Sequence, residues 1–195
     1  MMARRLLLVG FAAALPMAFG CSSSVDDPTP SFACTGGAAA ANTVTMVCGG
    51  GNDTTQQVDV VIDGQDLPEL KLNGLDFNVM YDGLSLTLMS EDHSAASQLF
   101  PGALVSVAVP PSTEPNTVSG YSGYKDVVVG IHMTGNALAP IVVGQHVVLS
   151  LTFQRAAGTT FTAPVLFNPD RTKVATPTSA GTAFADGLSL SYLYR

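Results

Sequence analysis

One stretch of the chain, residues 72–83, has a pattern that a β-strand accommodates and a helix does not. An Asn-Gly pair at 73–74 gives a strong turn signal. Apolar side chains then alternate with mostly polar ones, with Leu75, Phe77, Val79 and Tyr81 on one face and Asp76, Asn78 and Met80 on the other. A period of two residues indicates a strand with one side buried. The leucines at 84, 86 and 88 repeat the pattern, which predicts a second strand.

The same alternation recurs to the end of the chain and predicts an all-β domain. The expected strands are 58–62, 75–81, 84–89, 103–109, 125–133, 145–153, 159–167, 172–176 and 187–194. Val109 and Val147 are among the side chains expected to face inward. Residues 94–100 suit one helical turn. The 19 glycines and 12 prolines lie mostly between short apolar runs. This arrangement favours a nine-stranded jelly-roll β-sandwich.

The first twenty residues read as an export signal. Arg4 and Arg5 precede an apolar run from Leu6 to Phe19, which is too short for a comfortable membrane span of about 20 residues. Residues 18–21 resemble the lipobox of bacterial lipoproteins, and this resemblance implies that Cys21 is lipidated. Ser22 after it implies the outer membrane. An ordinary signal peptide, cleaved elsewhere, is the alternative.

Removal of residues 1–20 leaves an acidic chain. It takes away two of the eight cations and lowers the net charge from −7 to −9. Six scattered cations are unsuited to binding nucleic acid, which requires a clustered basic surface. We interpret residues 21–56 as a tether that includes a small segment closed by a disulfide, and residues 57–195 as the folded domain. Membrane contact is then expected through the lipid alone.

Two cysteines remain once Cys21 is assigned to the lipid. Cys34 and Cys48 are expected to form a disulfide, because export places them in an oxidising compartment. Such a bridge would pin a short strand at 43–48. A metal pair is the rival reading, but two cysteines without a nearby histidine make a poor metal site.

Three segments of the chain resemble the cohesin family. They are the turn and strand at 72–82, the strand at 144–153 and the closing strand at 186–191. The resemblance spans about residues 57–195. It implies a sandwich that binds a protein partner, such as a dockerin, through one sheet face. Gly83 departs from the proline that the family favours there.

The outer faces of two strands supply candidate partner-binding residues. If 125–133 and 145–153 pair as a hairpin with Ile131 opposite Val147, His132 lies opposite His146. The candidates on that face are Val128, His132, His146 and Val148, because the resemblance places both strands in the partner-binding sheet. Two histidines could begin a zinc site, but a third ligand is needed.

The sequence gives little support for nucleophilic catalysis or for calcium binding. Residues 120–124 resemble part of a nucleophile elbow, but a strand follows where the motif requires a helix. Carboxylates at 63–69 and 91–92 leave calcium open as a ligand, without the regular spacing of a calcium loop. We therefore expect no catalytic residues and no required cofactor. The sequence predicts a noncatalytic lipoprotein that binds a protein partner; a carbohydrate-binding module is the alternative, and a hydrolase comes third.

Overall fold

The fold was obtained as a computed structural model. It describes residues 30–37, 39, 43–63, 70–71, 74–109, 120–121, 123–134, 141–142, 144–158, 160–168, 173–175, 183–184 and 188–194. In this part of the chain, no helix is long and apolar enough to cross a membrane. The expected signal peptide, the lipidation candidate Cys21 and the polar segment up to residue 29 lie outside the described residues.

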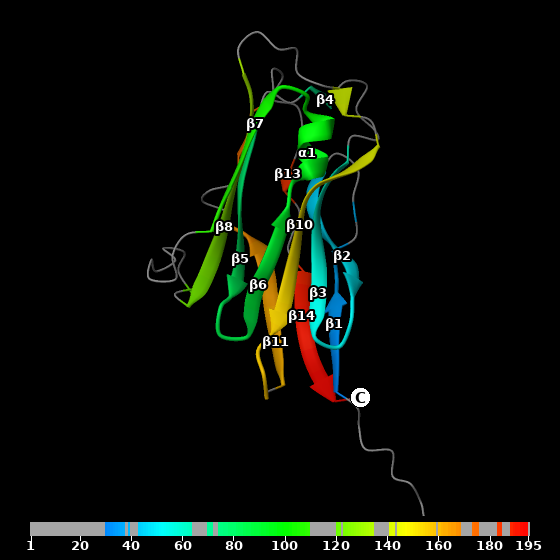
Figure 1. The fold of residues 1–195 in the computed structure, drawn as a ribbon, viewed down its shortest axis with the longest axis vertical. Helices are drawn as coiled ribbons and strands as arrows, with labels where there is room; N and C mark the ends of the chain where they lie inside the picture. The colour runs from blue at the N-terminus through cyan, green and yellow to red at the C-terminus, as the bar shows by residue number, and fades with distance from the viewer. Residues whose placement is uncertain are drawn as a thin grey trace, which may run out of the picture.

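Two large sheets form an all-β sandwich (Figure 1). The seven-stranded sheet has the order β1 (Pro30–Thr35), β14 (Leu188–Tyr194), β11 (Phe161–Phe167), β5 (Gly74–Asp82), β8 (Tyr124–Met133) and β7 (Ala103–Ala108), with β12 (Lys173–Ala175) also paired to β5. The five-stranded sheet has the order β13 (Ala183–Phe184), β2 (Thr43–Gly51), β3 (Thr55–Asp63), β10 (Gln145–Arg155) and β6 (Leu86–Asp92). The short strands β4 (Leu70–Lys71) and β9 (Ile141–Val142) pair with each other, and α1 (Ser94–Leu99) links β6 to β7. All nine expected strands are present, as is the expected helical turn.

The core lies between the two sheets and is made of the side chains that the alternation placed inward. From the seven-stranded sheet, β5 and β8 contribute Phe77, Val79, Tyr81, Val127, Val129 and Ile131. From the five-stranded sheet, β3 and β10 contribute Val58, Val60, Ile62, Leu149, Leu151 and Phe153. Aromatic contacts join the elements further: the Phe77 and Phe167 rings meet edge to face at 5.8 Å. The period-two pattern therefore identified the buried face correctly on β5 and β8, and on β10 from Leu149 onward.

The sandwich begins earlier in the chain than the sequence suggested. Strands β1 and β2 were expected to belong to a tether and to the disulfide-closed segment within it. Instead, β1 pairs with β14 and β2 pairs with β3. Phe32, Val44 and Met46 are buried in the core. The described domain thus starts at Pro30, not at residue 57, because these strands supply apolar side chains that the sandwich needs.

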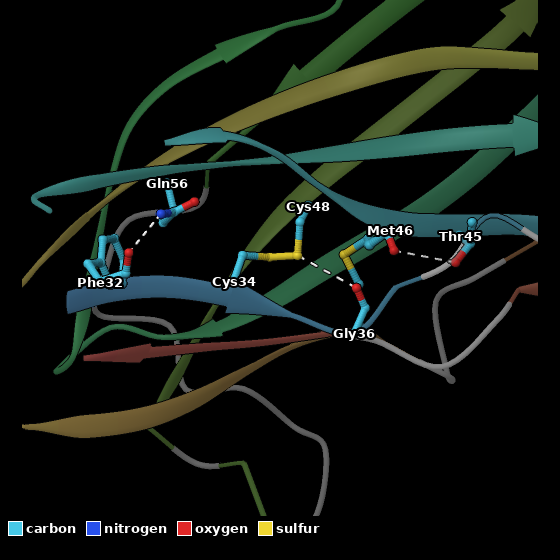
Figure 2. Close-up of a disulfide and its surroundings, with 7 residues drawn as sticks. All are labelled: Phe32, Cys34, Gly36, Thr45, Met46, Cys48 and Gln56. Carbon is cyan, nitrogen blue, oxygen red and sulfur yellow. Dashed lines mark hydrogen bonds between the residues drawn. A yellow bond between two sulfur atoms is a disulfide. The ribbon is translucent and has the colours of Figure 1, made fainter. Parts of the chain in front are cut away.

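The expected disulfide between Cys34 and Cys48 is present, with Cα atoms 5.7 Å apart. Figure 2 shows that it joins β1 to β2, so it links one sheet to the other. Nearby, the Gln56 side chain donates a hydrogen bond of 2.8 Å to the Phe32 carbonyl and adds a second tie between the sheets (Figure 2). The bridge is therefore part of the sandwich rather than of a tether.

Three side chains expected inside are exposed. Leu84 is 84% exposed, because it lies in the turn before β6, where its amide donates to the Asp82 carboxylate at 2.9 Å. Val109 lies one residue beyond the end of β7 and is 47% exposed. Val147 faces outward because the pairing of β10 with β3 shifts register between Val147 and Leu149. A β-bulge of this kind turns the residues on one side of it to the opposite face.

Candidate functional site

On the outer face of the seven-stranded sheet, where β5, β8 and β7 run side by side, polar side chains surround the backbone of Gly130, and we call this site the hollow. The strand register places Asp76 opposite Gly130 and Gly130 opposite Ser106. One step along the same face, Leu104 lies opposite His132. All these positions point away from the core because they alternate with buried residues such as Phe77 and Val129.

Gly130 allows three polar side chains to close over the strand, because it has no side chain of its own in the middle of the sheet. A Cβ added there would lie 3.1 Å from Ser106 Oγ and 3.3 Å from both Asp76 Oδ1 and His132 Nε2. A hydroxyl, a carboxylate and an imidazole therefore converge on one point of the surface. Glycine inside a strand often marks a place where another molecule approaches closely.

The imidazole and the carboxylate of the hollow are already paired with each other. His132 Nε2 lies 2.9 Å from Asp76 Oδ1, and their side chains are 51% and 46% exposed. Ser106 donates a long hydrogen bond of 3.4 Å to the Gly130 carbonyl. The pair is held in place by two adjacent strands, so the imidazole and the carboxylate present their remaining hydrogen-bonding capacity to solvent in a fixed geometry.

Serine, histidine and aspartate together suggest a catalytic triad, but their geometry is wrong for one. In a triad, one ring nitrogen of histidine binds the carboxylate and the other faces the serine hydroxyl. Here the nitrogen over the hollow, Nε2, is the one that contacts Asp76. The Ser106 hydroxyl is directed to a backbone carbonyl. This arrangement suits hydrogen bonding to a ligand rather than proton transfer.

Apolar surface surrounds the hollow. Leu104 is 61% exposed, and Val128 is partly exposed on the next strand. Asn78, opposite Val128 in the register, is only 3% exposed, and its Nδ2 has no hydrogen-bond partner among the described residues. Exposed leucine and valine beside hydrogen-bonding groups resemble the composition of protein interfaces.

The four candidate partner-binding residues do not share one face. The expected hairpin between 125–133 and 145–153 is wrong: β8 belongs to the seven-stranded sheet and pairs with β5 and β7, whereas β10 belongs to the five-stranded sheet and pairs with β3 and β6. His132 and Val128 therefore lie on one sheet, and His146 and Val148 lie on the other. Chain proximity suggested the hairpin, but the connection after β8 crosses between the sheets.

On the five-stranded sheet, the two candidates differ in their exposure. Val148 is fully buried at the β-bulge of β10. His146 is partly buried and borders a cavity of about 380 Å³ beside α1, together with Gln98 and Gln145. The zinc idea required His132 and His146 as neighbours and is excluded by their places in separate sheets.

No metal cluster is visible in the described part of the chain, where no three His, Cys, Asp or Glu side chains could hold one ion. At the end of β6, Glu91 Oε2 lies 2.8 Å from His93 Nδ1. Asp92 accepts a hydrogen bond from the Ser94 amide, which lowers the pKa of its carboxyl. These acids are engaged in the turn that starts α1. The other acidic loop, after Asp63, lies outside the described residues.

The suspected nucleophile elbow is a turn leading into β8. The Tyr124 amide donates to the Tyr121 carbonyl at 3.0 Å, and the two rings meet edge to face at 4.9 Å. Partial burial, and then the Asp82 carboxylate, raise the pKa of Tyr124. Ser122 itself lies outside the described residues.

Sequence reasoning missed a slot of mixed polar and apolar lining on the open side of the sandwich. It measures about 420 Å³ and lies between β6 and the start of β8, with Tyr81, Leu88, Met89 and Lys125 among its walls. Burial raises the pKa of Tyr81 above that of ordinary tyrosine. The slot opens where β7 ends opposite Val128, so that the first residues of β8 have no neighbour on that side among the described strands.

Solved cohesin structures resemble this domain. CaCohA2 in its complex with CaDoc0917 matches with a TM-score of 0.50 at 16% sequence identity, over 73% of this chain and 95% of that one. The third cohesin of ScaC from Acetivibrio cellulolyticus, in complex with the ScaB dockerin, gives 0.48 at 14% identity over 69% and 87% of the two chains. The Coh-OlpA-Doc918 complex from Clostridium thermocellum gives 0.49 at 12% identity over 82% and 96%.

At such low identity the likeness shows the fold alone, and the match to CaCohA2 carries that conclusion. The described domain has the cohesin fold. No protein-family model matches the chain, and no curated protein matches it.

Proposed function

We propose that this chain is a noncatalytic protein-binding module that holds a partner on the outer face of its seven-stranded sheet. The polar hollow at Gly130, with exposed Leu104 beside it, is the observation that carries this proposal. The hollow offers fixed hydrogen-bonding groups, and Leu104 offers apolar area that a partner would bury.

The fold supports the proposal, and the similar solved structures include complexes. Two of them are cohesin–dockerin complexes. For this chain, a dockerin-like protein is the partner class that we propose. The side chains of Ser106, Asp76 and His132 already occupy the space above Gly130, so a partner would contact their exposed polar atoms rather than the Gly130 backbone.

The lipid anchor and the location complete the proposal. Lipidation of Cys21 would tether the sandwich to the bacterial outer membrane through the polar segment before Pro30. A chain anchored in this way presents its partner at the cell envelope without spanning the membrane.

A pull-down tests the binding face. Residues 22–195, which keep every described strand, are immobilised and exposed to lysate and secreted proteins of the source organism, with and without calcium. Leu104→Glu changes the proposed face. Leu84→Glu is the matched control, because Leu84 is also exposed but lies in the turn between β5 and β6.

We expect the wild type and Leu84→Glu to retain the same protein in a saturable way, and Leu104→Glu to lose at least about tenfold in affinity, which is the effect of one hot-spot contact. Equal retention by both variants would place the partner elsewhere on the domain. Retention of polysaccharide instead of protein would favour the carbohydrate-binding alternative.

A further inference from the structure

Strand β7 has a regular and uncharged free edge. It pairs with β8 through six consecutive residue pairs without a register shift, and on its other side no described strand pairs with it. Figure 1 shows it at the outer border of the seven-stranded sheet. Its sequence, Ala-Leu-Val-Ser-Val-Ala, contains no charge, proline or glycine. Such an edge is a template for pairing with another strand.

Two other edge strands in the described part of the chain, β6 and β1, are protected. β6 shifts register against β10 and ends in Glu91 and Asp92. β1 begins with Pro30 and is bound to β2 by the disulfide at Cys34. Bulges, charges and prolines are the usual means of blocking edge-to-edge pairing. Their absence from β7 distinguishes this edge from the others.

Apolar side chains are left uncovered along this edge on both faces of the sheet. Leu104 on the outer face is 61% exposed, and Val109, directly after the strand, is 47% exposed. Val105 and Val107 are only partly buried against the core. A strand added beside β7 would cover all four.

We infer that the edge of β7 pairs antiparallel with β7 of a second copy of this chain, with Ser106 at the two-fold axis. An axis perpendicular to the sheet keeps the outer faces of both copies on the same side. Side chains alternate between the two faces of a strand, so residues opposite each other must then both have even numbers or both have odd numbers. The register centred on Ser106 meets this condition and sets Leu104 against Ala108, Val105 against Val107 and Val109 against Ala103 of the second copy.

The second copy fits this edge because the pairing is self-complementary. Every opposed pair is apolar, except the serine pair at the axis, whose hydroxyls can hydrogen-bond to each other. No charge of either strand is buried, although each chain is acidic overall. The axis turns one copy upside down relative to the other, so the β1 strands point in opposite directions. The pairing therefore suits chains anchored to facing surfaces better than neighbours in one membrane.

The association is expected to be weak. One strand from each copy buries less than the standard interface of about 1,600 Å², so a dissociation constant of roughly 10 µM to 1 mM is expected. The inference concerns the edge of the sheet and does not depend on the proposed partner on its face.

Sedimentation equilibrium of residues 22–195 over this concentration range tests the pairing. Ser106→Asp and Ser106→Lys each place like charges opposite each other at the axis, and an equal mixture of the two places opposite charges there. We expect the wild type to dimerise, each variant alone to weaken the dimer about tenfold or more, and the mixture to restore it as a heterodimer. Restoration in the mixture also shows that both variants fold.

A wild type that stays monomeric across the whole range would overturn the inference. Variants that dimerise as well as the wild type, or a mixture that associates no better than its components, would overturn the register centred on Ser106. A monomer that instead pairs with a strand of another protein would show that the edge has a different occupant.

Discussion

Removal of the Cys34–Cys48 bridge is expected to destabilise the domain by about 3 kcal/mol. The two cysteines are 14 residues apart in sequence. In the chain-entropy model, closing a loop of about 15 residues stabilises the folded state by roughly 3 kcal/mol, by restricting the unfolded chain. For a domain of roughly 150–250 residues, each kcal/mol corresponds to about 2–4 °C, so the melting temperature should fall by roughly 6–12 °C.

The assay is urea and thermal unfolding of residues 22–195, comparing the wild type with the Cys34→Ala/Cys48→Ala double variant. Cys34 packs against the core, so the alanines also remove a little apolar contact. Reduced wild type controls for this loss, because it keeps both side chains and lacks only the bridge. We expect the reduced protein and the double variant to unfold at similar urea concentrations, well below the oxidised wild type.

A loss below about 1 kcal/mol in both samples would refute the reasoning. It would mean that β1 and β2 remain close in the unfolded chain, or that their pairing with β14 and β3 holds them without help. A large loss in the double variant alone would assign the effect to packing.

Two further perturbations test the core. Phe77→Ala should cost about 3–5 kcal/mol in urea unfolding, because Phe77 is fully buried and packs edge to face on Phe167; a loss below about 1 kcal/mol would contradict the packing described. Burial raises the pKa of Tyr81. The free energy of unfolding should therefore fall as the pH rises through the tyrosine range, since the unfolded chain ionises first. In the Tyr81→Phe variant, the free energy of unfolding should fall less at alkaline pH. An unchanged pH profile in this variant would contradict the role assigned to Tyr81.

The strands could be predicted from the sequence because burial of one face leaves a period of two residues. The alternation at 75–81 and 125–133 correctly identified Phe77, Val79, Val127 and Val129 as core residues. The alternation says nothing about which strands are neighbours, since any pair of strands with one apolar face satisfies it. The hairpin expected between 125–133 and 145–153 was wrong for that reason.

Other features left a weaker signal or none. The segments around β1 and β2 are rich in alanine and glycine, so their strands carry few large apolar side chains to mark them. The bulge in β10 turns Val147 outward and Val148 inward, opposite to the prediction. An inserted residue keeps the apolar composition of the strand but breaks its period of two. Only one feature of the sequence pointed to the hollow, the glycine at position 130 within the strand expected at 125–133. Asp76 and Ser106 joined it only through pairing between strands distant in the sequence.

The three histidines of the chain allow the proposed binding face to be tested directly. His132 lies at the hollow on the seven-stranded sheet, whereas His93 lies beside α1 and His146 starts β10 in the five-stranded sheet. Their ring C–H signals can be followed by NMR as the captured partner is titrated into residues 22–195, with His→Gln variants to assign them. We expect the His132 signals to shift or broaden in a saturable way, while those of His93 and His146 keep their positions. Perturbation of His146 or His93 with His132 unchanged would contradict the account and place the partner on the other side of the sandwich.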